Sequence, residues 1–571
     1  MKDYAAIATG YARDVVEGRV PACKWVRLAC QRHLSDMDRA AAGWDYVWNP
    51  ELVDTKGKPY RPADRICRFA ELMPHIKGDW AARGERIRLE PWEVFILACI
   101  FGWIVAATGK RRFRKADLYI PRKNAKSTIA AVIGLYMLTA DGEFGAEVYS
   151  GATSKDQAME VFRPASLMAK ASPQFRAHYG VLVSASNLAV PETNAKFEPL
   201  IGNPGDGASP SLSITDEYHE HRTSEQYDTM VTGMGARSQP LALVITTAGS
   251  NIGGPCHSHQ QEGQKVLEGV IENEQRFVII FGIDEGDDWT KPEVLVKANP
   301  NYGVSISAEF LQAAQLDAIQ DPRKQAVFKT KHLNVWVNAA HPWINLEAWL
   351  RMADPSLRRE DFAQYPGAIG LDLASKNDIA SHADLFRKKV DGLWHYYLFT
   401  KNYLPEAAVQ KVENAHYQEW VHRGHLITTP GNMIDLQVIE EGVVASADVC
   451  NIDDIAMDAW GSREMAPSLQ QQNYTVVDVP MTTRNLSEPM KVIAALVEAG
   501  RFHHDGNLAT TWMFSNVEVA EDRNENIFPR KSKAEKKIDA AVATILAMGR
   551  LMVGIEDEGD PFVNLNALET A

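Results

Sequence analysis

One stretch, residues 117–128, constrains the fold of this chain more than any other. It reads Asp-Leu-Tyr-Ile-Pro-Arg-Lys-Asn-Ala-Lys-Ser-Thr, and an apolar run over 129–138 follows it. The apolar residues 118–120 predict a buried strand, so the order is strand, tight turn, Lys-Ser and helix. This order is typical of a phosphate-binding loop, where helix-terminal amides face the phosphates, a lysine reaches the β- and γ-phosphates and a hydroxyl holds Mg²⁺.

The stretch departs from the usual pattern G-x-x-x-x-G-K-[ST] at both glycines, which are Ile120 and Ala125 here. Taken alone, the motif is weak and favours a basic turn before an ordinary helix. If it is a phosphate loop, ATP would be held by the turn and the first helical turn. These residues are Arg122, Lys123, Asn124, Ala125, Lys126, Ser127 and Thr128.

An aromatic and an acidic residue, Trp92 and Glu93, precede the loop in an expected helix whose first turn contains Pro91. Such a pair upstream of a phosphate loop can hold adenine. The alternative is equally open: Trp92 would be a core residue and Glu93 an acid near the positive end of a helix dipole.

Two further strands are expected to end in polar residues. The apolar run 212–215 is followed by Asp216 and Glu217, and an ATPase needs one acid to support Mg²⁺ and one to polarise the attacking water. The run 241–249 ends with Thr246 and Thr247, which could sense the γ-phosphate or could form a plain strand-to-turn transition. Strands that alternate with helices predict a parallel α/β sheet.

The second half of the chain carries spaced acids. Asp372 lies in one expected strand, Asp458 ends another, and Asp539 lies beside the apolar stripe of a helix expected over 534–548. Three acids on such elements can converge on a pair of divalent metals for phosphodiester cleavage, and oxygen ligands suit Mg²⁺ or Mn²⁺. Asp378 could be a fourth acid, although each carboxylate taken alone favours a place on the surface.

Composition limits the class of protein. The chain has 571 residues and a net charge of −14, which argues against a protein that coats nucleic acid, although a local basic groove stays possible. Its six cysteines lack paired spacing, which suits reduced thiols, and no apolar run predicts a membrane span. We expect an N-terminal helical segment, an ATPase domain, a linker, a nuclease domain and a mobile acidic tail, over 1–60, 61–336, 337–366, 367–550 and 551–571 respectively.

Together these motifs resemble the large terminase subunit of tailed bacteriophages, the motor that packages DNA into procapsids. The resemblance runs from roughly residue 60 to 550, and each motif alone is weak. The motifs that carry it, in order, are 89–93, 121–128, 151–157, 215–217, 245–249, 333–336, 370–372 and 536–543.

The resemblance implies an α/β fold: a P-loop ATPase with a parallel sheet of the additional-strand type, followed by a ribonuclease-H-like nuclease domain. It implies ATP-driven translocation of double-stranded DNA and a two-metal endonuclease that cuts concatemeric DNA. Carried over by position, one set of residues serves ATP hydrolysis and a second set serves cutting. The first set is Lys126 and Ser127 (phosphates and Mg²⁺), Asp216 (metal), Glu217 (water), Arg122 (transition state), and Thr246 and Thr247 (coupling); the second is Asp372, Asp458 and Asp539.

The chain departs from the family pattern at two positions. Glu93 stands where the family usually has a glutamine that reads adenine, and Ala125 replaces a glycine, which constrains the loop backbone. The resemblance also implies partners: a small terminase subunit, the portal of the procapsid and further copies in a ring, expected to be pentameric. It implies work in the host cytoplasm, transient docking on procapsids, absence from the mature virion, and no membrane.

Other functions are weighed against this one. A helicase or restriction-type translocase outside capsid assembly would share the ATPase, but usually carries a second helicase-like domain in place of three nuclease acids. A capsid or portal-associated protein with decayed sites would not need Lys126, Glu217 and the acids. A metabolic P-loop enzyme leaves residues 366–550 unexplained.

Overall fold

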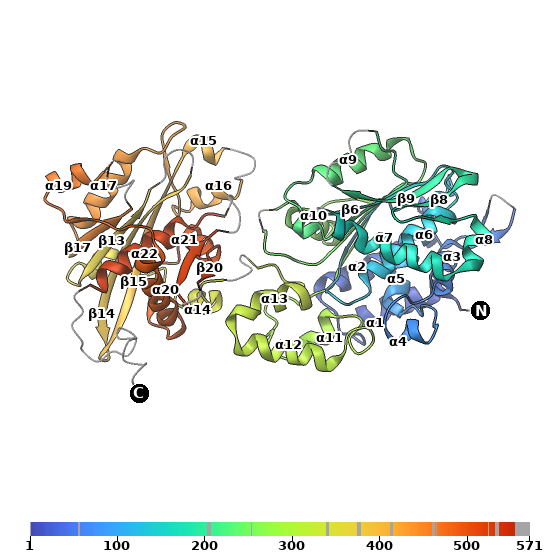
Figure 1. The fold of residues 1–571 in the computed structure, drawn as a ribbon, viewed down its shortest axis with the longest axis horizontal. Helices are drawn as coiled ribbons and strands as arrows, with labels where there is room; N and C mark the ends of the chain where they lie inside the picture. Colours follow the sequence, from blue (N-terminus) through green and yellow to red (C-terminus); the bar gives the residue numbers. More distant parts are fainter. Residues whose placement is uncertain are drawn as a thin grey trace. The chain divides into compact units, whose positions relative to one another are not determined.

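The chain folds as two units, Met1–Val337 and Asn338–Ala571, and each has its own sheet and core (Figure 1). A computed structural model describes residues 2–54, 57–152, 154–201, 207–252, 254–337, 342–373, 378–410, 415–458, 463, 465–522, 525–531 and 536–553. No helix in these ranges is long and apolar enough to cross a bilayer.

The first unit contains the following helices and strands. In chain order they are α1 (Tyr4–Val16), α2 (Lys24–Ala41), β1 (Tyr46–Trp48), β2 (Leu52–Val53), β3 (Pro59–Tyr60), α3 (Pro62–Leu72), α4 (Gly78–Ala82), α5 (Pro91–Gly102), β4 (Trp103–Val105), β5 (Lys115–Tyr119), α6 (Lys126–Thr139), β6 (Glu147–Ala152), α7 (Lys155–Ala171), α8 (Pro173–Tyr179), β7 (Leu182–Val183), β8 (Leu188–Val190), β9 (Ala195–Ile201), β10 (Leu212–Asp216), α9 (Glu225–Gly233), β11 (Leu241–Thr246), α10 (Pro255–Leu267), β12 (Arg276–Ile280), α11 (Glu293–Ala298), α12 (Ala308–Gln320) and α13 (Pro322–His332).

Eight of these strands form one sheet, in the order β12-β5-β11-β10-β6-β9-β8-β7. Its first six strands are parallel, and β7 and β8 are antiparallel. Because β11 lies between β5 and β10, the strand before the Lys-Ser turn and the strand before the acid pair are separated by one strand. The additional-strand arrangement expected from the sequence is therefore confirmed.

The N-terminal residues do not form a separate segment, which differs from the expected division at residue 60. Helices α1 and α2 share one hydrophobic core with α5, α6 and the sheet, through fully buried residues such as Ala8, Val26 and Phe95. Helix α5 is apolar on every side, so it needs α1 and α3 to cover the faces that the sheet leaves exposed.

The helices after β12 have a smaller core of their own. Trp289, Leu295, Leu311 and Phe328 are buried together, with Leu333 at the end of α13. The two ends of this helical group return to the sheet, because Phe281 N donates to Tyr119 O and Arg122 N donates to Lys331 O, at 2.8 Å each.

The second unit contains α14 (Leu346–Arg351), β13 (Gly367–Asp372), β14 (Ala380–Val390), β15 (Leu393–Pro405), α15 (Glu406–Val409), α16 (Ala415–His422), β16 (Ile427–Thr429), α17 (Leu436–Ala447), β17 (Ile452–Met457), α19 (Ala466–Gln471), β18 (Val476–Asp478), α20 (Thr483–Glu498), β19 (Phe502–His504), α21 (Leu508–Ser515), β20 (Glu518–Glu521), β21 (Ile527–Arg530) and α22 (Asp539–Leu551). Its sheet has the order β16-β15-β14-β13-β17-β18, with β19 beside β15. Strands β13, β14 and β15 are antiparallel and β17 is parallel to β13, as expected for a ribonuclease-H-like nuclease.

Helix α22 lies directly on β13 and β14. The contact is closest at Gly370, where an added Cβ would overlap the carbonyl oxygen of Ala543. Figure 1 shows α22, in red, over the strands of this sheet. The helix begins at Asp539, not near residue 534 as the apolar stripe predicted, because Ile538 has a non-helical φ of −134° and ψ of 12°.

The linker expected over 337–366 is not a separate segment where the structure describes it. From residue 342 the chain belongs to the second unit, and Trp343 and Trp349 are 6% and 0% exposed in its core. Prolines and the lack of a helical period hid these aromatic anchors in the sequence. The expected acidic tail falls almost wholly on residues 554–571, which lie outside the described ranges.

Candidate active sites

The first candidate site begins at the turn between β5 and α6. Lys123 and Ala125 both have left-handed backbones, with φ of 68° and 55°. Ala125 is the N-cap residue of α6 and offers no side-chain cap, so the first amides of the helix stay open to a ligand. Ala125 therefore adopts the conformation that a glycine would take more easily, at a cost of about 1 kcal/mol.

Asn124 holds this turn in place from within. Its buried amide nitrogen donates to the carbonyl oxygens of Pro121 (3.2 Å) and Arg122 (3.1 Å) and to Asn299 Oδ1 (2.9 Å). Its oxygen accepts from Asn301 N at 2.9 Å. The predicted nucleotide ligand Asn124 is thus a buried brace of the loop.

Lys126 is buried in the first turn of α6 with its Nζ aimed at the acid pair. Nζ lies 3.6 Å from Glu217 Oε1, beyond hydrogen-bond length, and has no hydrogen-bond partner among the described residues. Burial lowers the pKa of Lys126, while the charges of Glu217 and Asp216 oppose that shift. A buried cation without donor contacts is suited to an anionic ligand such as a phosphate.

The acid pair sits where β10 ends. Glu217 has a left-handed φ of 47°, and its amide donates to Asp216 Oδ1 at 2.9 Å. Burial and the adjacent Glu217 charge raise the pKa of Asp216 to about 7. Burial also raises the pKa of Glu217, but the positive charges around it, led by Lys126 and including Lys331 and Arg122, outweigh burial, so the net pKa is lowered. The pair thus contains one carboxyl group with a raised pKa, Asp216, and one with a lowered pKa, Glu217.

The two threonines that end β11 are fully buried. Thr246 Oγ1 lies 2.9 Å from His219 Nδ1, and Thr247 Oγ1 donates to Ala248 O at 3.0 Å. Ala248 N donates to Asn334 Oδ1 at 2.5 Å, so the loop after β11 is tied to the end of the helical group. The structure thus brings Lys126, Asp216, Glu217 and Thr246 to one edge of the sheet.

Trp92 and Glu93 lie deeper than a base-binding pair would. They are 3% and 6% exposed, and Trp92 Nε1 donates to Asn301 Oδ1 at 2.8 Å. Glu93 Oε2 accepts from Glu90 N at 2.9 Å in a capping box at the start of α5. This geometry matches the alternative in which Trp92 is core and Glu93 is a helix-terminal acid. Burial raises the pKa of Glu93 to about 7.

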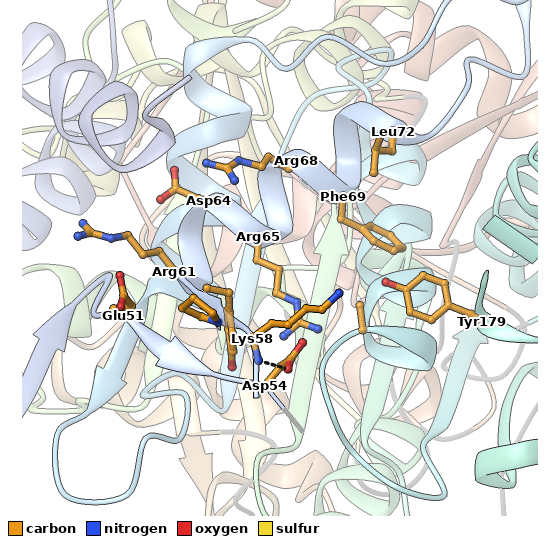
Figure 2. A pocket seen from close by; sticks show the side chains of 13 residues that line it. Glu51, Asp54, Lys58, Arg61, Asp64, Arg65, Arg68, Phe69, Leu72 and Tyr179 are labelled. Atoms are coloured by element: carbon orange, nitrogen blue, oxygen red, sulfur yellow. Dashed lines mark hydrogen bonds between the residues drawn. The ribbon is translucent and has the colours of Figure 1, made fainter. Parts of the chain in front are cut away.

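One cavity in this unit lies away from the acid pair. It measures about 490 Å³ and is lined by α3, by Glu51, Asp54 and residues 58–61, and by Ala140 and Tyr179 (Figure 2). Figure 2 shows Arg61, Arg65 and Arg68 projecting beside acidic side chains. Ala140 is the C-cap of α6, so the cavity faces the negative end of the helix whose positive end carries Lys126.

The second candidate site forms where β13 and β17 end side by side. Leu371 pairs with Met457 in parallel register, so the next residues, Asp372 and Asp458, are neighbours on adjacent strands. Asp539 opens α22, which the close contact at Gly370 holds over β13. The topology thus brings the three predicted acids together from two strands and a helix.

Burial and neighbouring negative charge perturb the carboxylates of the second site. Burial, then the charges of Asp539 and Asp458, raise the pKa of Asp372 well above its usual range. Burial and the charge of Asp378 raise the pKa of Asp539 to about 7. Asp539 Oδ2 is buried without a hydrogen-bond partner among the described residues. Such carboxylates fit a divalent cation, which would offset their repulsion.

Asp378 lies at the rim of this acid group. Lys537 Nζ is 2.7 Å from its Oδ1, and Lys531 Nζ is 4.0 Å from its Oδ2. Within the described ranges, no group of three acidic, histidine or cysteine side chains lies close enough together to hold a metal ion.

Sequence reasoning missed His219 and Lys331, whose contacts join elements far apart in the chain. Arg237, which comes just before β11 and could by its position reach a phosphate or lie on the surface, pairs with Glu147 at 3.1 Å, at the end of the sheet where β11 begins. The signal for His219 was its position, two residues after Glu217.

Comparison with known proteins gives two family matches. Residues 91–265 match the terminase large subunit ATPase domain, and residues 270–554 match the terminase large subunit endonuclease domain. The second match begins ahead of β12, inside the first structural unit, so its start is not the boundary between the two units.

Two related proteins match this chain over most of their own length. Protein YmfN of Escherichia coli (strain K12) is 42% identical over 359 residues, which is 61% of this chain and 79% of that protein. The large terminase subunit of Enterobacteria phage HK97 is 25% identical over 522 residues, covering 87% of this chain and 97% of that protein. The crystal structure of the HK97 large terminase covers 86% of this chain and 99% of that one, with 23% identity and a TM-score of 0.43.

Proposed function

The chain belongs to the terminase large subunits, the ATPase and endonuclease of phage DNA packaging, and from this premise we propose how its residues divide the work. ATP hydrolysis in the first unit drives double-stranded DNA into a procapsid. The acids of the second unit cut concatemeric DNA to begin and to end packaging. The observation that carries the first part is the buried Lys126 ammonium, 3.6 Å from Glu217 and without a hydrogen-bond partner among the described residues.

In the ATPase site the open amides of α6 and Lys126 bind the phosphates. Ser127 and Asp216 would hold Mg²⁺, which supplies charge neutralisation when bound. Glu217 keeps a lowered pKa, so it is an anion at pH 7 and can orient and deprotonate the attacking water. Arg122 and Lys123 are exposed beside the loop, where each can reach a phosphate. Thr246 senses the γ-phosphate, with Thr247 behind it.

In the nuclease site Asp372, Asp458 and Asp539 would hold two Mg²⁺ or Mn²⁺ ions, which supply Lewis-acid chemistry for phosphodiester hydrolysis. The fit rests on the raised pKa values of Asp372 and Asp539 and on the partnerless Asp539 Oδ2. Asp378 joins this site from its rim, with Lys537 as its partner. The lysines near Asp378 can then face the phosphates of the DNA.

The assembly we propose contains more than this chain. A small terminase subunit selects the DNA, the portal of the procapsid receives it, and several copies of the chain, five in our proposal, form a ring. The work takes place in the host cytoplasm, and the subunit leaves before the virion is mature. The guanidinium of Arg122 is exposed and makes no ion pair with any described residue, so it is available to its own or a neighbouring active site.

The test is protection of linear DNA from nuclease by purified procapsids, with ATP and the cognate small subunit. We compare the wild type, Lys126→Ala and the control Lys324→Ala, which removes an exposed lysine paired with Asp317. Protection that requires ATP and Lys126, and that survives Lys324→Ala, supports packaging. DNA-stimulated ATPase and metal-dependent cutting without protection would favour a translocating nuclease outside capsid assembly.

A further inference from the structure

The side chain of His219 is enclosed by both halves of the ATPase site. Its ring is buried, and its Nδ1 lies 2.9 Å from Thr246 Oγ1 and 3.2 Å from Glu217 Oε2. Its Nε2 lies 2.9 Å from Lys331 Nζ. One ring therefore contacts the end of β11, the water-activating acid and the end of α13.

The partners of His219 determine which ring nitrogen carries the proton. Thr246 Oγ1 donates to Thr247 O at 3.0 Å and accepts from His219 N at 3.2 Å, so it offers Nδ1 an acceptor. A carboxylate oxygen of Glu217 also faces Nδ1, and it can only accept. At Nε2 the Lys331 ammonium, 2.9 Å away, can only donate, whereas the Glu220 carboxylate, 3.1 Å away, can only accept. Because the contact with Lys331 is the shorter one and Nδ1 faces two acceptors, we assign the neutral Nδ1–H tautomer to the ring.

Charge and burial agree with that assignment. Burial is the largest cause and lowers the pKa of His219; the Glu220 carboxylate beside Nε2 opposes that shift, the Lys331 ammonium adds to it, and Glu217 opposes it, with a lowered pKa as the net result. Glu217, Glu220 and Lys331 are the charged groups in contact with the ring among the described residues. A neutral ring with one N–H has to divide that donor between Thr246 and Glu217.

The loop after β11 leaves room for this ring at one glycine. A Cβ added at Gly249 would lie 3.0 Å from both Cβ and Cδ2 of His219, which is tighter than ordinary packing. Lys331 is itself fixed to the phosphate loop, because its carbonyl accepts from Arg122 N at 2.8 Å. The ring thus has little freedom to move away from Glu217.

We propose that His219 is a positioning residue of the ATPase site, which shares its Nδ1–H between Thr246 and Glu217 and accepts from Lys331 through Nε2. In the structure the bond to Thr246 is the aligned one, and Glu217 Oε2 has no aligned hydrogen bond to any described residue. The ring therefore limits where the carboxylate can point while leaving an oxygen free for water. This role rests on the proposed ATPase chemistry of Glu217.

Two conservative replacements separate the two ring nitrogens. The amide nitrogen of asparagine lies about where Nδ1 does, so His219→Asn keeps the donor toward Thr246 and Glu217. The amide of glutamine lies about where Nε2 does, so His219→Gln keeps an acceptor for Lys331 but loses the donor. His219→Ala removes both. A control, His33→Ala, removes an equally buried histidine that contacts Thr9, Cys99 and Trp103 instead.

The experiment measures steady-state ATPase kinetics and the affinity for a non-hydrolysable ATP analogue in the full chain. We expect His219→Ala to lower kcat about 10²-fold, because a misdirected base loses its alignment with water. Analogue affinity should stay within about threefold, and His219→Asn should restore most of the lost kcat while His219→Gln does not. His33→Ala should leave kcat near the wild type.

Three results would overturn the proposal: kcat near the wild type in His219→Ala, equal losses in the Asn and Gln variants, or a loss confined to analogue affinity. If His219→Ala fails to fold, the ratio of kcat between the Asn and Gln variants decides alone. A wild type without Lys126-dependent hydrolysis would instead reject the proposed ATPase function, so the two failures are distinguishable.

Discussion

The two sites treat their carboxylates in opposite ways. At the end of β10, Lys126 and Lys331 surround Glu217 and hold its pKa low. At the ends of β13 and β17, burial and then neighbouring carboxylates raise the pKa values of Asp372 and Asp539, and the nearby lysines, one of which pairs with Asp378, oppose that rise only in part. The cations of the chain therefore hold the pKa of Glu217 low, whereas those near the nuclease acids do not, and we expect a divalent metal to supply the missing charge there.

The two sites also differ in the groups that face their carboxylates. In the ATPase site the protein cation lies 3.6 Å from the acid it balances. In the nuclease site Asp539 Oδ2 is buried without a hydrogen-bond partner among the described residues, and Lys531 and Lys537 lower the pKa of Asp539 less than burial and Asp378 raise it. We therefore expect ATP to add to an ordered site, and divalent metal to organise the other.

The largest expected effect breaks the ATPase side alone. Glu217→Gln should lower ATP turnover about 10³-fold, because the amide keeps the shape of the side chain but cannot take a proton from water. ATP binding should be kept, and cutting of plasmid DNA with Mg²⁺ should be unchanged. The measurement is phosphate release beside a gel assay of the same preparation.

The control for that variant is Glu198→Gln, which removes a partly buried carboxylate paired with Lys196 on β9 of the same sheet. Its turnover should match the wild type. Normal turnover in Glu217→Gln, with the fold intact, would remove this carboxylate from the mechanism.

The next effect breaks the nuclease side alone. Asp539→Asn should reduce Mg²⁺-dependent cutting about 10²-fold or more, because the metals lose a charged ligand. In EDTA the same variant should unfold at a higher temperature than the wild type, since one repelling carboxylate is gone. Adding Mg²⁺ should raise the Tm of the wild type and leave the variant almost unchanged. A metal-induced rise of equal size in both would reject Asp539 as a ligand.

The pH dependence of stability sharpens the comparison. The pKa of Asp539 is raised from 3.8 to about 7, so between these values the folded state holds a proton that the unfolded state has lost. Stability from this group is therefore present near pH 4 and lost as pH rises to 7. We expect the Tm in EDTA to fall over that range more steeply for the wild type than for Asp539→Asn. Parallel curves would mean that Asp539 is not perturbed in the folded state.

These residues were readable in the sequence because their signals are local. Lys126, the pair Asp216-Glu217 and the acid Asp372 each sit at a strand end next to an apolar run, and the family pattern ordered them. The additional strand and the nuclease sheet followed from that order. Which of the many acids converge could be proposed in this way, but not their pKa values.

Other features depend on contacts that no local pattern carries. His219 meets Thr246 and Lys331, which lie 27 and 112 residues away. Trp343 and Trp349 anchor a stretch that lacks helical period, so it was taken for a linker. Glu93 precedes the phosphate loop in the sequence, yet its carboxylate caps α5. Tertiary packing decided each of these.

The smallest effect concerns the backbone at the two sites. The nuclease site uses Gly370, where no Cβ fits beneath α22, whereas the ATPase site places Ala125 at a left-handed φ of 55°. Ala125→Gly should therefore stabilise the first unit by about 1 kcal/mol through relief of that conformation, reduced by the entropy of the more flexible unfolded chain. The matched control is Ala130→Gly, inside the same helix, which should destabilise by about 1 kcal/mol or more. Urea unfolding of both variants measures the change in the free energy of unfolding, which should have opposite signs in Ala125→Gly and Ala130→Gly. Destabilisation by Ala125→Gly would mean that the loop relies on the restricted backbone of alanine to keep the α6 amides open. The turn would then hold the phosphate loop as firmly as the close contact at Gly370 holds the nuclease acids.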